Sequence, residues 1–166
     1  MLPLLNSTQV AYNDHFYRAR LRTLQAVDEI VEGMVTRLQN AGVLDNTYII
    51  YSSDNGFHIS QHRLPPGKTC GFEEDINIPL IVRGPGVPQG EITDVITAHS
   101  DLSPTFLKMA GASQRPDFDG TPIPLNEQEL VEAKAVRQEH VNIEFWGKAI
   151  PEGIYDYTSQ DGNKSK

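Results

Sequence analysis

Hydrophobic residues recur at steps of three and four near the start of the chain, on a background of polar positions. They form one apolar stripe, which consists of Leu21, Leu24, Val27, Val31, Val35 and Leu38. This spacing predicts an amphipathic helix over residues 14–40. We expect Asn13 or Asp14 to cap its start, and Asn40 with Gly42 to mark its end.

Two shorter runs with a different pattern follow this helix. Residues 47–53 are mostly β-branched and aromatic, which is typical of a strand. Residues 78–82 form a continuous apolar run that ends before Gly84, which favours a strand buried on both faces, as in a parallel sheet. The segment between the two runs is a polar loop with two adjacent prolines.

Weaker signals in the second half predict four more elements and a tail. In chain order they are a strand at 94–97, helices at 101–111 and 126–139, a strand at 141–146, and a disordered tail over 151–166. The alternation of helix and strand indicates an α/β fold. Ligands of such sheets bind beyond the carboxyl ends of the strands, which directs attention to Asp54 and Asn55.

Charge and composition exclude some classes of protein. The net charge of −8, without clustered Lys or Arg, argues against a nucleic-acid partner. No apolar run is long enough to span a membrane, and residues 1–10 lack the features of a signal peptide. The single Cys70 excludes a multi-cysteine zinc site and an internal disulfide framework. The oligomeric state and the compartment stay open.

Asp54 and Asn55 support two interpretations. Their carboxylate and amide oxygens are ligands that calcium and magnesium prefer. However, they precede Gly56, and an Asn-Gly step is also a common signal for a tight turn. Taken alone, the pair is explained better by a turn than by a metal site.

The loop after this pair carries further charged and titratable side chains. His58 and His62 have a spacing that chelates zinc on a helix, but Gly56 and the prolines indicate a loop and no third soft ligand is near in sequence. The two histidines remain candidates for donating hydrogen bonds to an anion. Lys68 and the acidic residues 73–75 are, taken alone, typical of solvated surface charges.

Read together, several segments resemble the sulfatase family, most closely arylsulfatases and N-acetylglucosamine-6-sulfatases. These segments are residues 26–28, 48–58, 67–69, 72–73, 78–81, 84–86, 101–105 and 118–120. The resemblance covers about residues 14–125, and the joint match in order and spacing is far more specific than any single motif.

The resemblance implies an alkaline-phosphatase-like fold, with a mostly parallel sheet flanked by helices, present as a partial domain over residues 1–150. It implies hydrolysis of a sulfuric ester, either a small molecule or a carbohydrate sulfate. Asp54 and Asn55 match two ligands of a calcium site, which magnesium could also occupy, and Lys68 matches the lysine that grips the sulfate. His58 and His62 have no certain family counterpart and stand as further candidate substrate contacts. Secretion or a lysosomal location is compatible with the family.

The chain also departs from the family. The family's nucleophile is a cysteine matured to formylglycine in a Cys-x-Pro-x-Arg motif, and Cys70 does not lie in one. Two earlier acidic metal ligands are missing as well. We therefore expect the second half of a sulfatase catalytic domain, inactive alone. A phosphatase or phosphonate hydrolase of the same superfamily, or a non-catalytic truncated remnant, are the alternatives.

Overall fold

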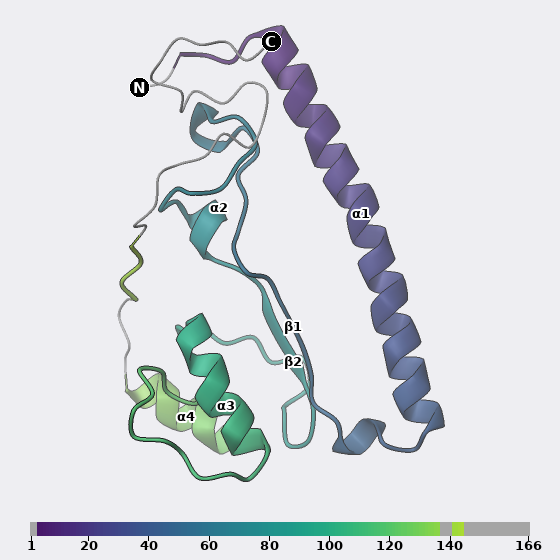
Figure 1. The fold of residues 1–166 in the computed structure, drawn as a ribbon, viewed down its shortest axis with the longest axis vertical. Coiled ribbons are helices and arrows are strands. Elements are labelled where there is room, and N and C mark those ends of the chain that lie inside the picture. The colour runs from purple at the N-terminus through teal and green to yellow at the C-terminus, as the bar shows by residue number, and fades with distance from the viewer. Residues whose placement is uncertain (1–2, 137–140, 145–166) are drawn as a thin grey trace. The chain divides into compact units, whose positions relative to one another are not determined.

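The computed structural model describes residues 3–136 and 141–144 (Figure 1). Its helices and strands are α1 Ser7–Asn40, β1 Ile49–Ser52, α2 Glu73–Ile76, β2 Leu80–Arg83, α3 Leu102–Met109 and α4 Glu127–Ala135. Short 3₁₀ turns lie at Leu44–Asn46, Gln61–Arg63 and His99–Asp101. The chain divides into two compact units, and the boundary between them falls after Ile81. None of the helices described is both long and apolar enough to cross a membrane.

Helix α1 begins earlier than its apolar stripe predicts. Asn6 caps it: the Gln9 N–H donates to the Asn6 side chain over 2.9 Å, and the Asn6 N–H donates to the Gln9 side chain over 3.0 Å. This reciprocal capping box starts the helix at Ser7, about two turns before residue 14. The prediction that Asn13 or Asp14 caps the helix was wrong, because Asn13 lies buried inside it.

Polar and aromatic side chains near its start connect α1 to the loop after β1. The Asn13 amide donates a hydrogen bond to the Ser60 hydroxyl over 2.6 Å. One turn later, Phe16 stacks on Phe57 with ring centroids 5.5 Å apart. The predicted apolar stripe is not buried: Leu21, for instance, is 46% exposed. The two buried residues of α1 are the polar Gln9 and Asn13: the side chain of Gln9 bonds to the cap, and that of Asn13 bonds to the loop.

Strands β1 and β2 form a two-stranded sheet, the part of the predicted α/β sheet that the described residues contain. Partly buried and exposed residues alternate along β2, and Ile81 is 61% exposed. The expectation that this strand is buried on both faces was therefore wrong for the chain described here. The mixture of helices and strands fits an alkaline-phosphatase-like fold at a coarse level.

The two weaker strand predictions were not met. Residues 94–97 are irregular, because the Val95 N–H donates to the side chain of Thr93 over 3.2 Å and so bonds locally instead of to a neighbouring strand. Residues 141–144 are also irregular, and the rest of that predicted strand lies outside the described residues, as does the predicted tail. The last residues of the helix predicted at 126–139 lie outside them too.

The second unit is organised around Thr105 of α3, which is 1% exposed. Its hydroxyl donates to the Asp101 carbonyl over 2.5 Å and accepts from the Ile123 N–H over 2.8 Å. Ile123 is buried with two further apolar residues, Leu125 and Leu130. One threonine therefore fixes the segment that leads into α4, since both of its hydrogen bonds are shielded from water.

A close approach of two backbones fixes the segment after β1. The Gly56 N–H donates to the Asp75 carbonyl over 2.8 Å, and the Phe57 N–H donates to the Glu74 carbonyl over 2.7 Å. A Cβ added to Gly56 would lie 2.0 Å from the Glu74 carbonyl oxygen. Glycine is required here because no side chain fits between the segment and α2.

We predict that Gly56→Ala destabilises the chain by about 3 kcal/mol, because the backbone contact with α2 must open. Gly33→Ala is the matched control, since a Cβ there meets nothing within 4 Å in the middle of α1. The free energy of unfolding of this control variant should rise by roughly 0.5–1 kcal/mol, because alanine has a higher helix propensity than glycine. Urea unfolding followed by circular dichroism measures both changes, and equal stability of the two variants would contradict the prediction.

The ion pair between α3 and α4 should make stability depend on pH. The Lys108 ammonium lies 2.5 Å from the Glu129 carboxylate, which also accepts from the Leu125 N–H over 2.8 Å. Burial raises the pKa of Glu129, but these hydrogen bonds together outweigh it, so that the pKa is lowered. A carboxyl whose pKa is lower in the folded state stabilises the fold above its unfolded pKa of about 4.3, and this contribution is lost as the pH falls through the folded value.

We therefore expect Glu129→Gln to cost up to about 1 kcal/mol near neutral pH, since the pair is partly exposed. The difference from the wild type should shrink as the pH falls below about 4.3. Glu132→Gln, whose carboxylate accepts from the Gln128 amide on the exposed side of α4, is the control. Urea unfolding across this pH range is the measurement, and a pH-independent difference would argue against the ion pair as its cause.

Candidate functional site

The candidate site begins two residues after β1, where Asp54 and Asn55 follow the strand. The chain does not fold back here as a hairpin: α2 and a long loop separate β1 from β2. Gly56 has no positive φ, which the tight Asn-Gly hairpin turn would require. The glycine is needed for contact with α2, so a plain hairpin turn does not explain this segment.

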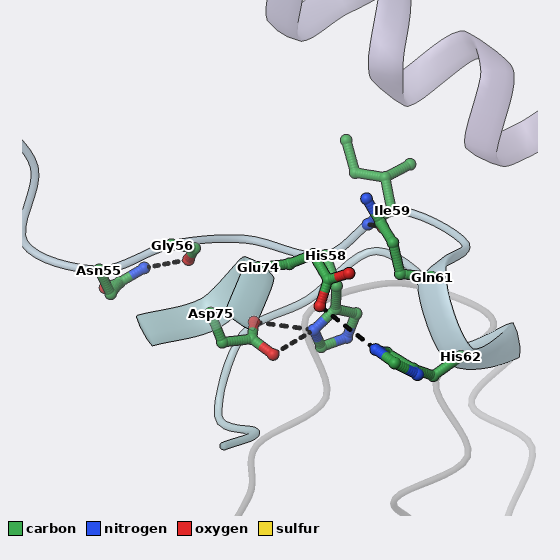
Figure 2. Close-up of polar contacts among 8 residues, drawn as sticks. All are labelled: Asn55, Gly56, His58, Ile59, Gln61, His62, Glu74 and Asp75. Atoms are coloured by element: carbon green, nitrogen blue, oxygen red, sulfur yellow. Dashed lines mark hydrogen bonds and ion pairs between the residues drawn. The ribbon is translucent and has the colours of Figure 1, made fainter. Parts of the chain in front are cut away.

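Local hydrogen bonds orient the two candidate metal ligands. The exposed carboxylate of Asp54 accepts from the Asn55 N–H over 2.9 Å and from the Ser53 hydroxyl over 3.4 Å. The Asn55 amide donates to the Gly56 carbonyl over 2.7 Å, which leaves its side-chain oxygen to point elsewhere (Figure 2). Both side chains therefore present oxygens just beyond the end of β1.

Lys68 returns to this position from the far side of the loop. Its ammonium donates to the side-chain oxygen of Asn55 over 3.4 Å. The preceding Pro65, Pro66 and Gly67 are buried, so the loop packs against the unit and carries the lysine back to the strand end. The structure thus brings together Asn55 and Lys68; whether the lysine grips a sulfate remains a prediction.

His58 lies at a different point of the loop, buried against α2. Its Nδ1 is 2.8 and 2.9 Å from the two carboxylate oxygens of Asp75, as Figure 2 shows. His58 is 4% exposed and Asp75 is 5% exposed. Backbone hydrogen bonds of 2.9 and 3.1 Å with Gly67 hold His58 in place. One ring nitrogen of His58 therefore already contacts a carboxylate, so only the other could donate a hydrogen bond to a bound anion.

His62 is exposed and has another partner. Its Nε2 lies 3.3 Å from the Glu74 carboxylate, and its ring stacks on Phe72 with centroids 3.8 Å apart. The pKa of Glu74 is lowered, mainly by a hydrogen bond from its own backbone N–H and further by His62, against an opposing effect of burial. The two histidines thus pair with neighbouring acidic residues of α2, not with each other.

The loop that holds these residues is conformationally strained. Four residues other than glycine have positive φ angles: Ser60, His62, Arg63 and Thr69. Such conformations cost of order 1–3 kcal/mol each and persist only where surrounding contacts enforce them. Two of the four are held by contacts with helices: the Ser60 hydroxyl accepts from Asn13 of α1, and the His62 ring lies beside Glu74 of α2.

The oxygens of Asp54 and Asn55 suit a divalent calcium or magnesium ion in kind but not in number. Calcium takes six to eight oxygen ligands, and magnesium six. Among the residues that the structure describes, Asp54 belongs to no group of three acidic, histidine or cysteine ligands. These two residues can supply part of a metal shell, and the other ligands must come from elsewhere.

The sequence pattern missed one participant of this region, Asp75. It stands in the acidic run 73–75, which was expected to be solvated, but its carboxylate is buried beside His58. The four residues of α2 are too few to show a helical period, so no pattern separates Asp75 from its less buried neighbours. The expectation that the acidic run is solvated was therefore wrong for Asp75.

Comparison with known proteins identifies the family of the chain. The sulfatase family profile matches residues 3–112. The chain is 54% identical over 128 residues to sulfatase ppz1 of Metarhizium majus, covering 76% of this chain and 30% of that protein. It is 40% identical over 178 residues to an arylsulfatase of Chlamydomonas reinhardtii, covering 99% of this chain and 27% of that protein. The chain belongs to the sulfatase family of sulfuric ester hydrolases.

The chain is also similar to human N-acetylglucosamine-6-sulfatase, with 45% identity over 109 residues, covering 66% of this chain and 20% of that protein. A solved structure of a protein in complex with its substrate, D-glucosamine-2-N,6-O-disulfate, superposes with a TM-score of 0.66. Its sequence is 33% identical, and the match covers 72% of this chain and 24% of that one. The chain thus spans less than a third of the length of each of these relatives.

The contrast between the two histidines is testable. His58→Leu leaves the Asp75 carboxylate buried without its partner, and should cost roughly 3–5 kcal/mol. His62→Leu is the matched control, because its contact with Glu74 is exposed and is expected to contribute less than about 1 kcal/mol. Thermal and urea unfolding of both variants measure this difference. Similar losses in both would show that the His58–Asp75 pair does not stabilise the unit.

Proposed function

We propose that this chain contributes the later metal ligands and the sulfate-binding lysine to the active site of a metal-dependent arylsulfatase-like enzyme. The observation that carries the proposal is the 3.4 Å contact between the Lys68 ammonium and the Asn55 side-chain oxygen. It unites, at the end of β1, two residues from segments that match the family. The substrate class is a small-molecule or carbohydrate sulfate ester, as the relatives' names suggest.

In this proposal each residue has a separate role. Asp54 and Asn55 would hold a calcium or magnesium ion, which would polarise the sulfate oxygens when bound. Lys68 would bind the sulfate group and neutralise the negative charge that develops on the leaving oxygen. The Lys68 ammonium contacts the amide oxygen of Asn55, which is neutral. The positive charge of Lys68 is therefore mostly uncompensated by this contact, which favours the binding of an anion.

The nucleophile is not among these 166 residues in the family's Cys-x-Pro-x-Arg form. Covalent catalysis needs an activated nucleophile aligned with the bound ester. His58 and His62 remain candidate substrate contacts of lower rank, because each ring already contacts a carboxylate of α2. We expect the chain alone to hydrolyse no aryl sulfate above a buffer blank.

A chimera tests the proposal. The chain would replace the matching segment of the Chlamydomonas reinhardtii arylsulfatase, with which it aligns over 99% of its length. Aryl sulfate turnover by the chimera should fall on the order of 100–1,000-fold in Lys68→Ala, because the charge of the transition state loses a fixed cation. Asp54→Ala should lower turnover and also raise the calcium concentration needed for activity.

Lys134→Ala is the control, because Lys134 is an exposed lysine that pairs with Glu91 in the other unit. Its turnover should match that of the parent chimera. Circular dichroism and thermal unfolding confirm that each variant is folded. Unchanged turnover in a folded Lys68→Ala chimera would reject the sulfate role of this lysine.

A further inference from the structure

A second group of metal-ligand side chains lies beside the residues proposed to bind sulfate. A ring nitrogen of His58, the Sγ of Cys70 and a carboxylate oxygen of Asp75 all lie within 4.8 Å of one another. They come from the start of the loop, its far side and α2. We propose that these three residues form a binding site for a transition metal ion, with Zn²⁺ as the occupant.

The chemistry of the three ligands selects zinc over calcium and magnesium. Thiolate, imidazole and carboxylate are the three ligand types that proteins use for Zn²⁺. A soft thiolate disfavours hard cations, which bind oxygen. The dipositive charge also balances a thiolate and a carboxylate in a region where two of the three side chains are buried. This site therefore differs in kind from the oxygen pair of Asp54 and Asn55.

The geometry places the ion between His58 and Asp75. Gly67 lies against the other ring nitrogen: a Cβ added there would be 3.2 Å from Nε2. Nδ1 is the ring nitrogen that faces the carboxylate of Asp75, at 2.8 Å, so an ion bound by both side chains would lie between them. Bonds of 2.0–2.3 Å to a tetrahedral Zn²⁺ set its ligand atoms roughly 3.3–3.8 Å apart. The hydrogen bond between the two side chains has to widen by only about 1 Å to admit the ion.

Two of the ligands are held before any metal binds. Backbone hydrogen bonds with Gly67 fix His58, and the Gly56 N–H fixes the Asp75 carbonyl over 2.8 Å. Cys70 is half-buried on the loop, so the site can be reached from solvent. Three protein ligands leave a fourth zinc position for water. A bound ion would tie the loop segment that carries Lys68 to α2.

Cobalt provides a direct spectroscopic test on the chain itself. The chain, freed of metal with a chelator, is titrated with Co²⁺ and then with Zn²⁺. A tetrahedral thiolate site gives a sulfur-to-cobalt charge-transfer band and strong visible bands, which Zn²⁺ should abolish and Ca²⁺ should leave unchanged. Cys70→Ser should remove the charge-transfer band and weaken Zn²⁺ binding on the order of 100-fold.

His62→Asn is the matched control, because this exposed histidine of the same loop lies outside the group and should keep full binding. Cys70→Ser nearly preserves the size of a half-buried side chain, and circular dichroism confirms its fold. Wild-type protein without a charge-transfer band, or equal Zn²⁺ affinity in the serine variant, would overturn the proposal. Neither result bears on the sulfate role of Lys68, which the chimera tests separately.

Discussion

The contact between the Gly56 backbone and α2 is the constraint on which the first unit depends. Because the two backbones meet without a side chain between them, the segment after β1 is fixed to α2, which follows it by fewer than 20 residues. His58 is thereby placed against Asp75, and the loop must fold back toward β1. The return of Lys68 to Asn55 follows from that path. One glycine thus determines where the charged groups of the site lie.

Within this unit, the two groups of residues that we propose as hard and soft metal ligands are separate. Asp54 and Asn55 offer oxygens at an exposed strand end, whereas His58, Cys70 and Asp75 lie deeper and include sulfur and nitrogen. Burial strengthens electrostatic interactions, so the deeper group requires balanced charge while the exposed pair does not. Under these proposals, a cation that prefers oxygen ligands would bind at the strand end in preference to the buried group.

The sequence predicted the principal helices, both strands of the sheet and the family, since long periodic segments and joint motifs carry strong signals. The predicted start of α1 was wrong because Asn6 and Gln9 cap the helix earlier in the chain. A cap formed by polar side chains does not show in the spacing of the apolar residues. Asp75 was missed because its burial depends on a contact with His58, 17 residues away in sequence. The proximity of Cys70 to His58 has the same cause: tertiary contacts bring together ligands that spacing alone does not connect.

The contacts that build the candidate site are short in sequence. Lys68 and Asn55 are 13 residues apart, and His62 and Glu74 are 12 apart; only the attachment of the loop to α1, from Asn13 to Ser60, spans as many as 47. Closing a loop of a dozen residues costs little entropy and takes well under a microsecond. During synthesis, the region from β1 to α2 can therefore assemble as soon as Asp75 has left the ribosome, before the second unit has been translated.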